Sequence, residues 1–269
     1  SFICSLCKRI GFDMKLRLFP TAFLAAVLLG CVKDQVPQEM VDNDPDVIDY
    51  VDEYGVNHGP GIKIGIHVWA PVNCGYHATD YKYGKMYQWG RKYGQGFGDD
   101  ATVPNRENGA VSLDIGNDKS NENVTFIGSY DSRYDWLSPQ NHLLWNSGPE
   151  FEPVKTEFDP CPEGWRVPNY AELDELFKNY SAFTTDLNGR AGRWFSGPKP
   201  YSVDVPQIFL PVSSKYLNGQ YLRGDNAYYW SSSPEGQQSL LIYFSRKSVQ
   251  QSPAGDYRHS SYSVRCILE

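Results

Sequence analysis

Residues 62–68 alternate strictly between apolar and polar side chains, in the order Ile-Lys-Ile-Gly-Ile-His-Val. A period of two predicts a half-buried β-strand across this segment. The strand leads into an apolar and aromatic segment at 69–76, and a second aromatic strand is expected within 83–94. The sequence therefore predicts that a folded domain begins near residue 60 with two strands.

A helical pattern follows Asn169. Glu172 lies three residues later and completes a capping box. In such a box the side chain of Asn169 accepts the backbone N–H of Glu172, and the side chain of Glu172 accepts the backbone N–H of Asn169. Leu173, Leu176 and Phe177 come next at helical spacing. The pattern predicts a short helix that begins directly after Asn169 and has one apolar face.

Short apolar runs return after this helix. Residues 95–158, by contrast, are rich in Gly, Asn, Asp and Ser, and they predict a long insertion of loops with a short helix at most. Short strands that follow a helix indicate an α+β domain built on an antiparallel sheet. These strands are expected at 193–195, 207–212, 227–230, 240–244 and 262–268.

Composition agrees with a strand-rich domain. Aromatic residues make up 14% of the 269 residues, with 19 Tyr and 7 Trp, and Gly and Pro are plentiful, a mixture that favours short strands and turns over a helical bundle. The formal net charge of the chain is −7. Residues 1–30 contain four basic residues and one acidic residue, a net charge of +3, so residues 31–269 have a net charge of −10. So acidic a domain is a poor candidate for binding nucleic acid or anionic lipid.

The N-terminal segment has the pattern of a targeting signal. A basic stretch at 14–17 precedes an apolar run at 18–29, which is too short to span a membrane and is typical of a signal peptide. The sequence LLGC at 28–31 resembles a bacterial lipobox, in which the thiol of Cys31 would receive a diacylglycerol. We expect residues 1–13 to precede the natural start; a buried helix that ends at a chance cysteine is the alternative.

Residues 31–59 are predicted to form a flexible tether. They contain eight acidic residues and two prolines, and the apolar residues among them show no clear period. Like charges repel and prolines resist packing, so the segment should be extended. The alternative is that part of this segment packs against the domain. The expected organisation is a signal peptide at 1–30, a tether at 31–59 and one domain at 60–269.

The segment 159–176, DPCPEGWRVPNYAELDEL, is the most distinctive stretch of the chain. Together with YWSSS at 229–233 and SVRCI at 263–267 it resembles the FISUMP family (fibrobacter major paralogous domain). That family is common on the surfaces of Bacteroidetes-type bacteria and is related to the C-type-lectin-like fold. The resemblance covers 60–269, and it implies a C-type-lectin-like domain with one or two helices and long loop insertions. It also implies an exported lipoprotein of the outer membrane that faces the cell exterior.

Three cysteines remain after those up to residue 31 are set aside, namely Cys74, Cys161 and Cys266. An exported protein meets oxidising conditions in which disulfides persist. The resemblance implies a Cys161–Cys266 disulfide, because the long-range bridge of C-type-lectin-like folds ties the entry of the helix to the last strand. Cys74 would then be a buried free thiol. A Cys74–Cys266 pair is the competing possibility.

The sequence shows no constellation typical of an enzyme or a metal site. Five histidines are scattered without zinc-ligand spacing, and the serines at 231–233 lack a strand–turn–helix elbow. The carboxylates at 172–175 suit a helix terminus, and the Gly-rich segment 94–98 lacks the context of a phosphate loop. The calcium-ligand order of sugar-binding C-type lectins and the cysteine pair of formylglycine-generating enzymes are also missing. We therefore expect no enzyme, no cofactor and no metal.

The segment from 227 to 266 is the candidate ligand-binding surface. Tyr, Ser and Arg side chains on a rigid scaffold combine aromatic contact with adaptable hydrogen bonds, although a solvated sheet face would have a similar composition. The expected partner is a protein or glycan on a host or microbial surface. The predicted ligand-binding residues are Tyr228, Tyr229, Ser232, Ser233, Glu235, Gln237, Gln238, Tyr243, Arg246, Gln250, Gln251, Asp256, Tyr257, Arg258 and His259.

Two further hypotheses accompany a fixed-specificity adhesin. Retroelement-diversified surface lipoproteins resemble this chain in placing a hypervariable Tyr/Asn/Ser/Asp/His-rich segment at the C-terminal end of a C-type-lectin-like domain. In that case Trp230, Leu241, Val264 and Cys266 should stay fixed while the exposed positions around them vary. The other hypothesis is a structural component of a fimbria or cell surface that has no ligand of its own.

Overall fold

The structure is a computed structural model, which describes part of the chain. The predicted signal peptide at 1–30, Cys31, the first part of the predicted tether and Gln251 all lie outside the described residues. The described residues are 48–95, 105–123, 125–129, 134–179, 181–187, 190–197, 206–213, 215–217, 220–222, 224–250 and 253–269.

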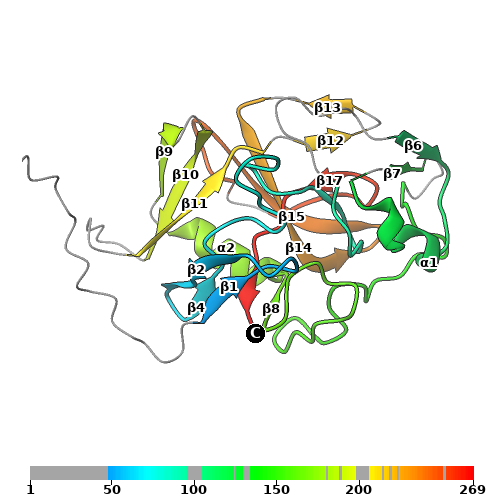
Figure 1. Cartoon of the computed structure of the whole chain (residues 1–269), viewed down its shortest axis with the longest axis horizontal. Coiled ribbons are helices and arrows are strands. Elements are labelled where there is room, and N and C mark those ends of the chain that lie inside the picture. The colour runs from blue at the N-terminus through cyan, green and yellow to red at the C-terminus, as the bar shows by residue number, and fades with distance from the viewer. Residues whose placement is uncertain are drawn as a thin grey trace, which may run out of the picture. The chain divides into compact units, whose positions relative to one another are not determined.

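Strands dominate the described chain, and its helices are short (Figure 1). Every strand pair except β6 with β7 is antiparallel, so the expectation of an α+β domain with mostly antiparallel sheets is confirmed. No helix in the described chain is both long enough and apolar enough to cross a membrane. The elements are β1 (Asp49–Val51), β2 (Asn57–Pro60), β3 (Ile62–Ile64), β4 (His67–Trp69), β5 (Tyr87–Gln88), β6 (Asn105–Asn108), α1 (Leu113–Gly116), η1 (Lys119–Asn121), β7 (Thr125–Gly128), β8 (Trp165–Arg166), α2 (Tyr170–Lys178), β9 (Ser181–Leu187), β10 (Arg190–Ser196), β11 (Gln207–Pro211), β12 (Lys215–Leu217), β13 (Gln220–Leu222), β14 (Asn226–Glu235), β15 (Gln238–Ser245), β16 (Ala254–Tyr257), β17 (Ser261–Tyr262) and β18 (Ile267–Leu268).

Small sheets share the core. One has the order β3-β4-β18-β8 and so brings the two ends of the domain together, and another has the order β13-β12-β17-β5. The sheets β14-β15-β16 and β11-β10-β9 are built from neighbours in sequence. Helix α2 packs against β10, β14 and β15, so it covers strands of two different sheets.

The strand predicted at 62–68 is a hairpin. Ile62 pairs with Trp69 and Ile64 with His67, which leaves a two-residue turn at Gly65 and Ile66. Gly65 has a φ of +64°, a left-handed conformation that glycine adopts without strain, and such a residue in a two-residue loop reverses the chain. Ile66 is consequently 81% exposed at the tip of the turn. The prediction of one strand across 62–68 is therefore wrong, because the glycine within the alternation forms a turn.

The predicted tether is wrong for residues 48–59. Strands β1 and β2 pair within it, and Tyr50 is only 1% exposed, with its ring edge-on to Trp165 at 5.2 Å between centroids. The acidic residues there have local partners: Asp49 accepts a hydrogen bond from Asn57, and Asp52 lies 2.9 Å from His58. The burial of the Tyr50 ring in the core therefore outweighs the repulsion between the acidic side chains of this segment.

The predicted helix cap is confirmed in detail. The backbone N–H of Glu172 donates to Asn169 Oδ1 at 2.9 Å, and the N–H of Asn169 donates to Glu172 Oε2 at 2.8 Å. Arg166 adds two hydrogen bonds to the same carboxylate. Leu173, Leu176 and Phe177 are buried on the face that packs against the strands.

The 95–158 insertion is only partly a surface loop. It contains α1, η1 and the β6–β7 pair, as the expectation of loops with a short helix allowed. However, Trp136 and Trp145 are fully buried in the core, and their indole N–H groups donate to the backbone oxygens of Trp89 and Arg91. The insertion therefore helps to form the core that the rest of the chain needs.

A disulfide joins the loop before α2 to the end of the chain. Cys161 and Cys266 are bonded, with Cα atoms 5.9 Å apart and a sequence separation of 105 residues, so the pairing implied by the resemblance is present and the competing Cys74–Cys266 pair is not. Cys74 is a buried free thiol whose Sγ lies within 4.8 Å of both disulfide sulfurs. Burial raises the pKa of Cys74 to about 12, so this thiol stays protonated. The strand predicted at 262–268 is divided in the structure. Strand β17 ends at Tyr262 and strand β18 begins at Ile267, and the two belong to different sheets.

Candidate functional site

Several of the predicted ligand-binding residues are buried and contribute to packing instead. The buried ones are Tyr229, Ser232, Ser233, Arg258 and His259. The pairing of β14 with β15 shifts register between Trp230 and Pro234, so the strict alternation of strand faces ends there and serines turn inward. These five positions are therefore corrected from ligand contacts to structural residues.

Most of these polar groups have specific hydrogen-bond partners in the fold. The Tyr229 hydroxyl donates to the backbone oxygen of Pro211 at 2.9 Å. Ser233 Oγ donates to Glu150 and accepts the N–H of Tyr170 in the first turn of α2. His259 Nδ1 lies 2.8 Å from the backbone oxygen of Ser129.

Arg258 is the clearest of these corrections. Its guanidinium carbon lies 4.3 Å from the centroid of the Trp89 ring, and its Nη1 donates to the backbone oxygen of Asn141 at 3.0 Å. Burial lowers the pKa of Arg258 to about 10, while Asp135 at 3.8 Å favours its charged form. A sequence rich in polar residues gives no sign that an arginine will be used inside the core.

The other predicted contact residues that the structure describes are exposed or half-buried. Glu235 and Gln237 flank the tip of the β14–β15 hairpin and are exposed, and so are Tyr243 and Arg246. Tyr228 lies opposite Tyr243 in the strand pair, with 5.6 Å between the ring centroids, and Tyr262 stacks on Tyr228 at 5.2 Å. Half-buried positions complete the set: Tyr228, Gln238, Gln250, Asp256 and Tyr257. We call Tyr228 and Tyr243 the tyrosine patch; the Tyr262 ring behind it is buried.

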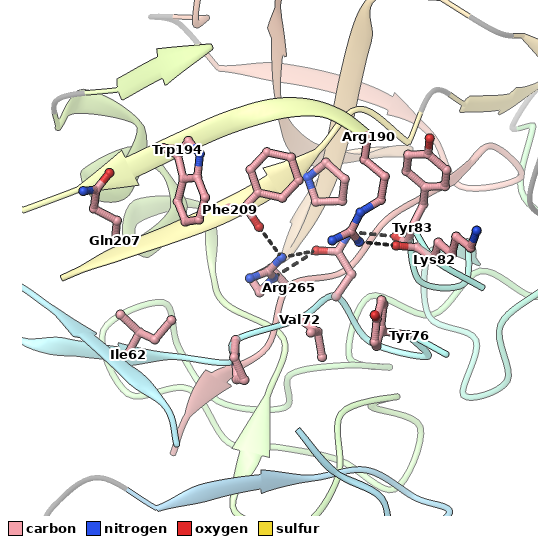
Figure 2. A pocket seen from close by; sticks show the side chains of 13 residues that line it. Ile62, Val72, Tyr76, Lys82, Tyr83, Arg190, Trp194, Gln207, Phe209 and Arg265 are labelled. Atoms are coloured by element: carbon pink, nitrogen blue, oxygen red, sulfur yellow. Dashed lines mark hydrogen bonds between the residues drawn. The ribbon is translucent and has the colours of Figure 1, made fainter. Parts of the chain in front are cut away.

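A cavity of about 350 Å³ lies elsewhere, between β10 and β11 on one side and the segment after β4 on the other (Figure 2). We call it the β10–β11 pocket. None of the ligand-binding residues predicted from the sequence lines it. The lining residues are Ile62, Pro71, Val72, Asn73, Tyr76, Lys82, Tyr83, Arg190, Trp194, Gln207, Phe209, Pro211 and Arg265.

Strand geometry places the aromatic wall of this pocket. Trp194 on β10 pairs directly with Phe209 on β11, and their ring centroids are 5.2 Å apart. Gly192 lies beneath the Phe209 ring, where an added Cβ would come within 2.3 Å of Phe209 Cζ. Only glycine leaves room for this ring to lie across the strand, so the sequence itself shapes the wall.

Arg265 forms the floor of the pocket and holds its walls together. Its Nη2 donates to Asn73 Oδ1 at 2.7 Å and to the backbone oxygen of Phe209 at 2.8 Å, and its Nη1 donates to the backbone oxygen of Ala70 at 2.9 Å. All of these acceptors are uncharged. Burial lowers the pKa of Arg265 to about 10, and the positive charge of Arg190 acts in the same direction.

Arg190 and Lys82 lie together at one end of the pocket (Figure 2). Arg190 is half-buried, and its Nη1 donates to the backbone oxygen of Lys82 at 2.5 Å. Its guanidinium carbon lies 5.8 Å from the centroid of Tyr76 and 5.6 Å from that of Phe209. The aromatic faces therefore hold the guanidinium in place while most of its N–H groups remain available.

The chemistry of the lining suits recognition. The described lining residues include three cations, four aromatic side chains and two side-chain amides. None of these described lining residues is Asp, Glu, His, Cys or Ser. Such a lining attracts an anionic group and packs against a flat apolar face. It offers no evident pair for acid–base or nucleophilic chemistry.

The sequence does not predict this pocket because its lining comes from six separate parts of the chain. The pattern at 193–195 predicts only a strand, and 69–76 stands out only as an apolar and aromatic segment. The available signal was the i, i+4 relation of Arg190 and Trp194 on one strand face, which pairs a cation with an aromatic side chain. Comparisons with family models, with curated proteins and with solved structures each find no match to this chain.

Proposed function

We propose that this protein is a ligand-binding or adhesion module, and that its principal binding site is the β10–β11 pocket. The observation that supports it best is the lining itself: aromatic rings and uncompensated cations around a cavity of about 350 Å³. Ligand sites of this kind occupy roughly 300–1,000 Å³ and combine apolar walls with a few polar groups.

The rigidity of the site favours this role. Arg265 has its hydrogen bonds in place, and Trp194 is held against Phe209 across paired strands. A preorganised lining loses little conformational entropy when a ligand binds, so more of the contact energy is available as affinity. The tyrosine patch is the second candidate surface, because it is the accessible remainder of the predicted C-terminal face.

The cellular setting is part of the proposal. The resemblance to the FISUMP family and to C-type-lectin-like domains supports a surface-exposed outer-membrane lipoprotein, anchored by lipid at Cys31. The disulfide between the loop before α2 and the last strands has the placement that the resemblance implies. In this setting the ligand would be a protein or glycan of a host or microbial surface.

Binding of the soluble chain from residue 32 to 269 to a glycan and protein array tests the proposal. This chain retains every described residue. Three proteins should be compared: the wild type, Trp194→Ala and Tyr243→Ala. We expect at least one ligand class to bind the wild type and the Tyr243 variant, and to be lost with the Trp194 variant.

The other outcomes separate the alternatives. Loss with Tyr243→Ala alone would move the site to the tyrosine patch. The absence of binding by the correctly folded wild type would contradict the proposal and favour a structural surface component.

A further inference from the structure

The charge of the β10–β11 pocket is opposite to that of the protein. The chain has a net charge of −7, yet the pocket is lined by Lys82, Arg190 and Arg265 and by no described carboxylate. The acceptors of Arg265 and the acceptor of Arg190 are neutral oxygens. A positive potential is therefore concentrated in one concave site of an acidic molecule, where it attracts an anionic ligand group.

The group that projects this potential toward a ligand is Arg190. A guanidinium has five N–H donors in a planar fork, and the described contacts of Arg190 use one nitrogen, Nη1, for the Lys82 backbone. The fork matches two oxygens of a carboxylate or of a sulfate ester better than an ammonium does. The exposed Lys82 side chain extends away from Arg190 (Figure 2), and its charge adds to the positive potential at this end of the pocket.

The rest of the pocket suits a ring. Figure 2 shows Trp194 and Ile62 at the end away from Arg190, with Phe209 between them and the cations. Trp194 is half-buried, so part of its indole remains accessible within the cavity. The volume of about 350 Å³ is near the lower end for small-ligand sites, which fits a single ring with short substituents.

The way the pocket is built favours a small ring over an extended peptide as its ligand. Extended peptides bind mainly through hydrogen bonds to an exposed strand edge, with side-chain pockets spaced along it. Here the lining consists of side chains from six separate segments that surround one cavity. A ring with an acidic substituent uses such a cavity fully, whereas an acidic peptide would place only one residue in it.

We propose that the β10–β11 pocket binds an acidic ring of an anionic saccharide, with the acid group on Arg190 and the apolar face of the ring against Trp194. This inference rests on the binding function proposed above and names its ligand class. The acid group is an oxyanion, and it has two possible sources, the carboxylate of a uronic or sialic acid and a sulfate ester.

The test measures affinity by calorimetry for defined oligosaccharides, using the chain from residue 32 to 269, which contains the whole described unit. Matched pairs are an oligosaccharide ending in a uronic acid, one ending in a sialic acid, one carrying a sulfate ester, and the neutral counterpart of each. An acidic peptide of similar charge is the remaining arm. We expect binding of a carboxylate or sulfate saccharide that is at least about tenfold tighter than that of its neutral counterpart, since a hydrogen bond to a charged group contributes that much.

Variants assign the effect to the pocket. Arg190→Gln and Trp194→Ala should each weaken acidic-saccharide binding about tenfold or more, and Arg190→Lys should restore part of it because the charge returns without the fork. Lys247→Gln is the control, since Lys247 is an exposed cation that lies outside both the pocket lining and the predicted ligand-binding residues. Thermal unfolding of each variant identifies any loss of fold, and the Lys variant keeps the test decisive if the Gln variant is unstable.

The outcomes distinguish this inference from the proposed function. Equal affinity for acidic and neutral saccharides, or an acidic peptide that binds as tightly, would overturn the saccharide assignment while leaving a binding module. Acidic-saccharide binding that Arg190→Gln and Trp194→Ala leave unchanged would overturn the pocket. If no arm binds and the array above is also empty, the binding function itself is contradicted.

Discussion

At the scale of single residues, the arginines show how the same side chain takes opposite roles. Arg258 and Arg265 are buried and satisfied by backbone and amide oxygens, while Arg190 is half-buried and keeps donors available. The burial of five predicted contact residues also reduces the number of positions at which the diversification hypothesis can expect variation. Side chains that are buried in the core would not tolerate free substitution. Exposed Glu235, Gln237 and Tyr243 remain the positions at which variation is expected.

Arg265→Ala should destabilise the protein strongly. The substitution removes hydrogen bonds to Asn73, Ala70 and Phe209 and leaves these oxygens without the donor that they have in the fold. We expect the free energy of unfolding to fall by about 3–5 kcal/mol, as measured by urea denaturation. Arg246→Ala, at an exposed arginine, should change it by less than about 0.5 kcal/mol. Similar losses in the two variants would show that Arg265 does not hold the pocket together.

The stability of the protein should depend on pH through Asp159. Burial raises the pKa of this carboxyl to about 6, although Lys155 and the N–H groups of Val167 and Cys161 favour its ionised form. The folded state therefore holds the proton more tightly than the unfolded chain does. The resulting stabilisation is complete below the unfolded pKa of about 3.9 and is lost as the pH rises through about 6.

Asp159→Asn isolates this contribution. The free energy of unfolding of the wild type, minus that of the variant, should increase by about 3 kcal/mol between pH 7 and pH 4, because each pKa unit corresponds to about 1.4 kcal/mol. Urea denaturation of both proteins at several pH values measures the difference. A difference that stays constant or shrinks toward low pH would mean that Asp159 is ionised in the fold throughout this range.

At the scale of elements, local patterns predicted what local physics determines. The capping box at Asn169 and the strands at 227–230 and 240–244 follow from neighbouring residues, and the structure confirms them. The packing of Tyr50 and the assembly of the pocket around Arg265 depend on residues far apart in the chain. No periodicity within one segment records such contacts, and so the packed segment before residue 60 and the pocket were missed.

Asn169→Ala tests the cap of α2. The change removes the acceptor for the Glu172 N–H, while the C-terminal Asn179 makes no such side-chain cap in the structure. We expect a loss of about 1 kcal/mol in the free energy of unfolding, against little change for Asn179→Ala. Chemical denaturation with circular dichroism follows both. An equal effect of the two substitutions would show that the box contributes nothing specific.

At the scale of the whole molecule, the disulfide connects the helix entry with the last strands, across a sequence separation of 105 residues. The Cys161→Ala/Cys266→Ala double variant should lose about 4–5 kcal/mol, the chain-entropy value for a loop near a hundred residues. Non-reducing peptide mapping of the wild type should recover Cys161 linked to Cys266 and free Cys74. A peptide containing Cys74 in a disulfide would contradict the pairing.

The proposed anchoring is a property of the whole protein in its cell. Replacing Cys31 by Ala removes the thiol that would receive the lipid. We expect the wild type in the membrane fraction and the variant outside it, as detected by fractionation and immunoblotting. A variant that remains with the membrane would show that Cys31 is not the anchor.

The central claim is that ligand binds at the β10–β11 pocket, and the tryptophans report on it directly. Six of the seven are fully buried, and Trp194 alone is half-buried and lines the pocket. The most direct measurement is the NMR signal of the Trp194 indole N–H, assigned with Trp194→Phe, during titration with a ligand that the array identifies. The account predicts that this signal shifts in a saturable way while the other six stay nearly constant. A Trp194 signal that does not move while the ligand saturates the protein would contradict it.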